Sequence, residues 1–96
     1  MDLERGDVVR SLAGHDKGEL FCVVDAGGGF LLLANGKERK LHSPKRKRVK
    51  HAQRAGRSAH PVFQRLRAGE PVGDHEVRRA LAAFRDERNQ QQSRRE

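Results

Sequence analysis

Short runs of β-branched and apolar residues, separated by glycine-rich turns, fill the first half of the chain. Such runs between turn signals are typical of β-strands. Asn35-Gly36 predicts a tight hairpin turn, because both residues tolerate positive φ. The pattern predicts five strands, at residues 6–12, 20–25, 30–34, 37–42 and 48–52. Strands this short, joined by tight turns, indicate a small β-barrel or sandwich within residues 1–53.

The pattern changes after the last expected strand. Residues 54–60 carry small and basic side chains without a period, as in a linker. Pro61 suits the first position of a short helix, and Asp74 suits the N-cap of a longer one. We therefore expect a helical extension over residues 61–90. Residues 91–96 contain no apolar side chain and are expected to form a disordered tail.

Composition limits the class of protein. With 34% hydrophobic and 35% charged residues, the 96-residue chain can form one small domain with a modest core. Cys22 is the single cysteine, which fits a reducing compartment and a buried strand position. There is no signal-like N-terminus, and the longest apolar run, 30–34, is too short to span a bilayer. We expect a cytoplasmic monomer that does not bind membranes and needs no cofactor.

Positive charge is concentrated in one stretch of the chain. The formal net charge is +8 at pH 7, but residues 37–57 alone hold ten Lys or Arg against one acid, Glu38. Such a concentration attracts phosphate backbones, and its affinity should fall steeply with salt. Anionic membranes are a weaker candidate, because no amphipathic helix with bulky apolar anchors accompanies the charges.

A glycine-bounded loop between two strands carries a family resemblance. Gly6-Asp7, an alternating strand, Gly14 and Lys17-Gly18, and a second valine-rich strand follow one another in the order typical of a KOW motif. The chain over residues 3–53 resembles short bacterial KOW-domain proteins that bind RNA. It is more distantly similar to e-type large-subunit ribosomal proteins of the L-fourteen-e group.

The resemblance implies a five-stranded SH3-like KOW barrel, with Gly6, Asp7, Gly14 and Gly18 in structural roles. The following helices are similar to the tail of the short bacterial members. The resemblance also implies RNA binding, often on the ribosome, with ribosomal proteins as further neighbours. Ser11 departs from the pattern, because many KOW strands have a β-branched apolar residue there.

The predicted RNA contacts are cations. The run KRKRVK should present a continuous basic stripe to phosphates, while the loop would place Lys17 and bare backbone amides at a small phosphate site. Alternatively, the loop glycines only make the turn. The predicted RNA-binding residues are Lys17, Lys37, Arg39, Lys40, Lys45, Arg46, Lys47, Arg48, Lys50 and Arg54. Arginines of the second helix either extend this surface or form a solvated face; they are Arg78, Arg79, Arg85 and Arg88.

Other chemistry is poorly represented. Phe21, Phe30, Phe63 and Phe84 are expected in the core, which favours recognition of RNA shape over base stacking. The spacing of the five histidines matches no zinc pattern, and no nucleophile has an evident base partner. We therefore expect neither a metal site nor an enzyme.

A different function remains open at this point. KOW modules also dock proteins, so the chain could bind a transcription or translation factor through its helical tail. That function needs an exposed apolar patch on Val77, Leu81 and Phe84, whereas RNA binding needs the basic residues. We favour RNA.

Overall fold

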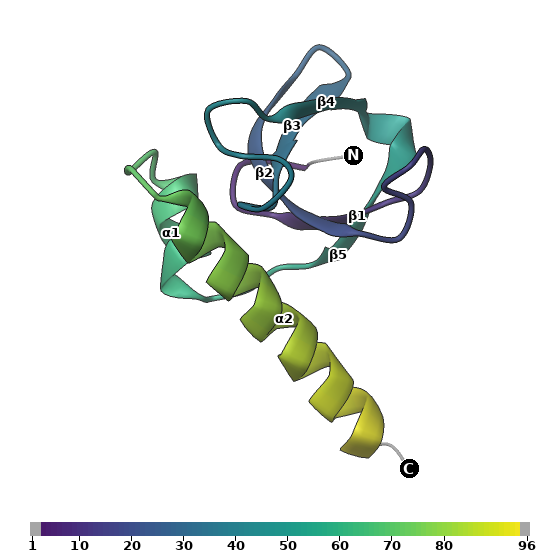
Figure 1. Ribbon diagram of the computed structural model, residues 1–96, viewed down its shortest axis with the longest axis vertical. Coiled ribbons are helices and arrows are strands. Elements are labelled where there is room, and N and C mark those ends of the chain that lie inside the picture. The colour runs from purple at the N-terminus through teal and green to yellow at the C-terminus, as the bar shows by residue number, and fades with distance from the viewer. Residues whose placement is uncertain (1–2, 95–96) are drawn as a thin grey trace.

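The computed structural model describes the backbone of residues 3–94 and the side chains of residues 3–88. Its elements are β1 (Val8–Ser11), β2 (Leu20–Gly27), β3 (Phe30–Ala34), β4 (Lys45–Arg48), the 3₁₀-helix η1 (Val49–His51), β5 (Ala52–Gly56), α1 (Pro61–Arg67) and α2 (Asp74–Arg94). The strands form one antiparallel sheet in the order β4-β3-β2-β1-β5, followed in the chain by the two helices (Figure 1). The predicted β-rich fold with a helical tail is confirmed.

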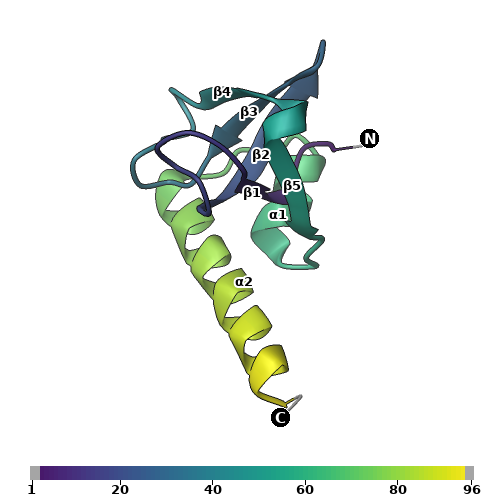
Figure 2. The ribbon, with the colours of Figure 1, turned by 90° about the vertical axis from the view of Figure 1, so that its right-hand side faces the viewer.

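The sheet curls and buries side chains on both of its faces (Figures 1 and 2). Successive residues of a strand point to opposite faces, so Val8 packs toward the helices while Val9 points into the curl. The inner cluster consists of Leu3, Val9, Phe21, Val23, Leu31, Leu33 and Ala52. The cluster under the helices consists of Val8, Leu20, Cys22, Ala34, Val62, Phe63, Leu66, Val77, Ala80, Leu81 and Phe84.

The first half of helix α2 carries its buried side chains. Val77, Ala80, Leu81 and Phe84 recur at helical spacing and are all buried. Beyond them the helix projects away from the sheet (Figure 2). It continues to Arg94, past the expected end of the helical extension at residue 90. Residues 95 and 96 of the expected tail lie outside the described residues.

The start of α2 differs from the predicted cap. The carbonyl of Gly73 accepts the N–H of Val77, and Glu76 Oε1 accepts the N–H of Gly73 at 3.0 Å, so Gly73 is the capping residue. Asp74 as N-cap is therefore wrong. Its Oδ1 instead accepts the N–H of Leu41 at 2.7 Å, which attaches the β3–β4 connection to the helix.

The positions of the last two strands also correct the prediction. Residues 37–42 form a turn-rich connection, and the fourth strand lies at Lys45–Arg48. The fifth strand is Ala52–Gly56, so it includes part of the expected linker 54–60. Alternating charge in KERKLH resembled a strand, but tertiary contacts hold that segment against α2 instead.

The turns before and after β3 differ in kind, and the second explains why no strand begins at residue 37. Gly28 and Gly29 both have positive φ and connect the paired residues Gly27 and Phe30, as a tight hairpin requires. Among the described residues, positive φ occurs only at glycines, so Asn35 does not, and a two-residue turn at Asn35-Gly36 is wrong. The Asn35 side chain instead accepts the N–H groups of Lys37 and Arg39, which folds a wider loop.

Gly36→Ala is expected to destabilise the fold more than Gly29→Ala. Both glycines have positive φ, +76° and +82°, which an L side chain adopts at a cost of about 1 kcal/mol or more. A Cβ at Gly36 would also overlap the Asp74 carbonyl oxygen, whereas one at Gly29 meets nothing within 4 Å. Denaturant unfolding of both variants measures the difference. Equal losses would contradict the close packing of the β3–β4 connection on α2.

Candidate nucleic-acid interface

Two buried carboxylates, Asp16 and Asp7, pair with some of the cations of residues 37–57. Asp16, in the β1–β2 loop, pairs with two lysines of β4: its Oδ1 lies 3.1 Å from Lys47 Nζ and its Oδ2 lies 2.7 Å from Lys45 Nζ. Ser11 Oγ donates to Asp16 Oδ1 at 2.7 Å and accepts from Lys47 at 2.9 Å. Ser11 is thus the buried polar partner of this cluster rather than a weak core position.

Lys47 is the clearest departure from the predicted stripe. Its side chain is only 7% exposed, and its ammonium also donates to the Ala13 carbonyl at 2.9 Å. All three of its donors therefore have partners inside the protein. Its charge balances Asp16 and ties β4 to the β1–β2 loop.

The ionisation of Asp16 follows from this cluster. Burial raises the pKa of its carboxyl, but hydrogen bonds from Lys45, Ser11 and Lys47 outweigh burial and hold that pKa far below its usual range. Asp16 is therefore charged in the fold at every physiological pH. The neighbouring lysines need this charge, because a buried ammonium without a counterion is strongly unfavourable.

Asp7 organises the cations that follow β4 in the same way. Its side chain is fully buried and accepts the N–H of Glu4 at 3.0 Å. Arg54 lies 3.4 Å and Arg57 3.3 Å from its two oxygens, and Arg57 also pairs with Glu4. Gly6, beside it, leaves no room for a side chain, because a Cβ would lie 2.6 Å from the Phe63 carbonyl oxygen. The structural roles expected for Gly6 and Asp7 thus have a physical basis.

Three amides of the β1–β2 loop are engaged within the protein. The N–H groups of Lys17, Gly18 and Glu19 donate to carbonyls of the loop and of β1. Gly14 and Gly18 have positive φ, so these glycines make the turn. These three amides are therefore not available to a phosphate, whereas the Lys17 side chain is exposed.

The predicted RNA-binding residues now separate into two groups. Lys45, Lys47 and Arg54 contact buried carboxylates. The others are exposed and form no ion pair with a carboxylate within the part of the chain whose side chains are described; they are Lys17, Lys37, Arg39, Lys40, Arg46, Arg48 and Lys50. We call these seven residues the exposed cation set.

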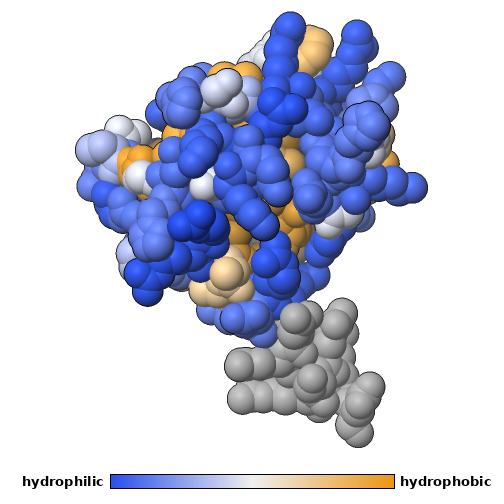
Figure 3. Space-filling view, viewed as in Figure 1, coloured by the Kyte–Doolittle hydropathy of each residue, from blue (hydrophilic) through white to orange (hydrophobic). Residues whose placement is uncertain are grey.

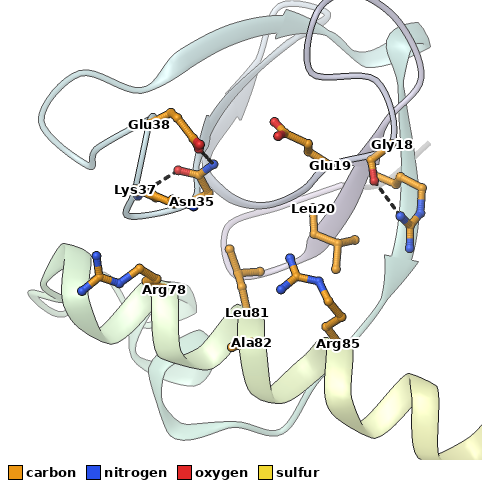
Figure 4. Close-up of a pocket in the computed structure, with 11 residues that line it drawn as sticks. Gly18, Glu19, Leu20, Asn35, Lys37, Glu38, Arg78, Leu81, Ala82 and Arg85 are labelled. Carbon is orange, nitrogen blue, oxygen red and sulfur yellow. Dashed lines mark hydrogen bonds between the residues drawn. The ribbon is translucent and has the colours of Figure 1, made fainter.

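One member of this set, Lys37, borders a groove between the sheet and α2. The groove has a volume of about 640 Å³, and its cations come from three separate segments: Arg10, Lys37, Arg78 and Arg85. Arg85 extends from α2 toward β2, and Asn35, Lys37 and Glu38 form the opposite wall (Figure 4). Glu19 and Glu38 also line the groove, but its four cations outnumber these two carboxylates, so its net charge is positive.

The sequence prediction missed Arg10. It donates to the Gly18 carbonyl at 2.7 Å at the rim of the groove. Its outward position between Val9 and Ser11 could have been found from strand alternation. Arg78 and Arg85 were expected either to extend the basic surface or to be merely solvated, and they line the same groove.

Little else on the surface suggests a different site. In the view of Figure 3, hydrophilic side chains cover most of the sheet, and the hydrophobic areas between them are small. Leu12 is the one large hydrophobic side chain that is exposed among those described. Burial raises the pKa of the Cys22 thiol to about 12, so this cysteine stays protonated in the core.

Metal ligands and membrane spans are not apparent in the described residues. Within them, no group of three His, Cys, Asp or Glu residues could hold a metal ion. None of the helices in that part is long and apolar enough to cross a bilayer. The chain matches no protein-family model and no curated protein.

Asp16→Asn is expected to lower the free energy of unfolding at pH 7 by about 3 kcal/mol, because Lys47 would stay buried without its counterion. Asp25→Asn is the control, since this carboxylate is exposed and, within the described residues, accepts a hydrogen bond from the adjacent Ala26 N–H alone. It should change stability by no more than about 0.5 kcal/mol. Urea unfolding measures both variants.

A comparison of wild type with Asp16→Asn across pH also tests the lowered pKa of Asp16. Because the pKa of Asp16 is lowered on folding, its contribution is fully present above its unfolded value near 4 and is lost as the pH falls below it. Wild-type stability should therefore fall more steeply between pH 5 and about pH 2 than that of Asp16→Asn. Parallel curves for the two proteins would contradict the role of the Asp16 cluster.

Proposed function

We propose that this protein binds structured RNA without catalysis, through the exposed cation set and the groove beside α2. The observation that carries the proposal is the separation of charge on β4. Lys45 and Lys47 turn inward to Asp16, while Arg46 and Arg48 on the opposite face stay exposed. If Arg46 and Arg48 served only the fold, we would expect them to pair with carboxylates, as Lys45 and Lys47 do.

The fold supports the same proposal. We propose that the curled sheet is a closed SH3-like barrel of the KOW type. The inner cluster, which includes Phe21, Leu31 and Leu33, would fill such a barrel. The strands β4 and β5 are connected by the three residues of η1. Small barrels of this kind bind nucleic acid through exposed strands and loops.

Long-range electrostatics explains how binding would arise. Each phosphate neutralised by a lysine or arginine releases counterions, so separate contacts add up without base recognition. Lys37, Arg39 and Lys40 lie on the connection that Asp74 fixes to α2, so a partly fixed loop would present them. This arrangement favours a folded RNA that can reach both the loop and the groove.

Docking of a transcription or translation factor is the weaker proposal. It requires an exposed apolar stripe on α2, but Val77, Leu81 and Phe84 are at most 6% exposed. These side chains hold the helix on the sheet. The apolar surface needed for such a partner is therefore already used by the fold.

Lys37→Gln is expected to weaken binding to a folded RNA and to reduce the slope of log affinity against log salt by about one. Arg5→Gln removes the same charge from an exposed site near Gly69, after α1, and should leave that slope unchanged. Fluorescence anisotropy across a salt series measures both variants. Identical slopes for the two would indicate that net charge, and not this surface, controls binding.

We further propose, in line with the resemblance, that the RNA is ribosomal and that the protein works in the cytoplasm as a monomer. Tagged protein from a bacterial lysate should then sediment with a ribosomal subunit at low salt and be released at high salt. The variant Lys37→Gln/Arg39→Gln/Lys40→Gln should shift toward free protein, because it removes three exposed cations. It leaves the lysines that pair with Asp16 intact, so the fold should be retained. Wild-type protein that stays at the top of the gradient would contradict the ribosomal assignment.

A further inference from the structure

Phe30 differs from the other three phenylalanines. Phe21, Phe63 and Phe84 are buried, as the sequence predicts, whereas Phe30 is only half-buried at the start of β3. The expectation that Phe30 is a core residue is thus only partly met. A partly exposed ring beside cations can take part in stacking with an RNA base, which a buried ring cannot do.

The two exposed arginines of β4 lie over this ring. Cζ of Arg46 is 3.7 Å from the ring centroid, and Cζ of Arg48 is 5.6 Å from it. The register explains the arrangement: Arg48 is opposite Phe30 and Arg46 is opposite Leu32, so all four side chains share the outward face of the sheet. The ring thereby holds the Arg46 guanidinium, which is planar and still exposed, in a fixed position.

A small hollow opens beside this pair. It measures about 270 Å³, which leaves room for a single base but not for a helix. Phe30, Leu32 and Arg46 form its apolar and basic side. Gly27 and Gly28 also line it, and the space around them is open, because a Cβ on either would meet nothing within 4 Å. Asp25 lines the remaining side. Its carboxylate repels phosphate but accepts hydrogen bonds from the N–H groups of a base edge.

We infer that this hollow, formed by Phe30, Arg46 and Asp25, binds one unpaired nucleobase, which stacks on the Arg46–Phe30 pair. The inference rests on the proposed RNA binding and specifies its ligand. Bases inside a duplex are covered by their neighbours, so the RNA must offer a bulged or looped nucleotide. Recognition would then combine backbone contacts from the exposed cations with one base contact, instead of shape alone.

The test compares two RNA hairpins with the same stem, one fully paired and one with a single bulged 2-aminopurine. Wild-type protein should bind the bulged hairpin about tenfold more tightly. The fluorescence of 2-aminopurine should fall on binding as the base stacks. Phe30→Leu and Arg46→Lys should each bring the affinity ratio close to one. Phe30→Leu removes no charge and should leave binding to the paired hairpin within about twofold of wild type.

Matched variants separate stacking from charge and from stability. Arg46→Lys keeps the positive charge and loses the planar group, and Phe30→Tyr keeps the ring and should keep the ratio. Lys50→Gln removes an exposed charge outside the hollow and should weaken binding to both hairpins equally. If Phe30→Leu unfolds in thermal melts, Arg46→Lys decides the question.

The possible outcomes distinguish the two proposals. Wild-type protein that binds both hairpins equally, with a steep salt dependence, would overturn the base site and leave RNA binding intact. Wild-type protein that binds neither hairpin would overturn both. A bulge preference that persists in Phe30→Leu and Arg46→Lys would place the base contact elsewhere and overturn the site.

Discussion

The ion pair between Lys47 and Asp16 fixes the part of the molecule on which the charged surface depends. It connects the edge strand β4 to the loop between β1 and β2, across 31 residues of sequence. Because strand side chains alternate, fixing Lys47 inward also fixes Arg46 and Arg48 outward. A slip of one residue in the register of β4 would bury two arginines and expose two lysines, so this pair specifies the register as well as the contact.

A second constraint acts through α2. The helix is held on the sheet by its apolar stripe, and the carboxylate at its first turn holds the β3–β4 connection through the Leu41 N–H. The close approach of Gly36 to the helix backbone completes this contact. The same packing that stabilises the tail therefore forms one wall of the groove and fixes the loop that carries Lys37. In this small domain, stability and the proposed binding surface depend on the same contacts.

The parts of the fold that could be read from the sequence are those determined locally. The first three strands, both helices and the buried α2 stripe follow from periodicity, proline and turn signals, and they agree with the structure apart from their exact ends. The segment 37–42 could not be assigned correctly, because the Asp74 carboxylate that holds it is more than 30 residues away. Short polar segments have weak local preferences, and tertiary contacts decide their conformation.

The charged surface shows the same limit more sharply. The count of charges over residues 37–57 located the positive charge but could not show which cations are paired. Lys45 and Lys47 contact Asp16, and Arg54 and Arg57 contact Asp7. Both carboxylates lie earlier in the chain, in segments of low or negative charge. Those contacts form only when the sheet assembles. A basic run is therefore not a uniform interface: in a strand, alternate cations can serve the fold while their neighbours remain available. On β4 this division leaves two arginines over Phe30, the one phenylalanine that is not buried, so the proposed RNA affinity and base recognition would arise from the same strand face.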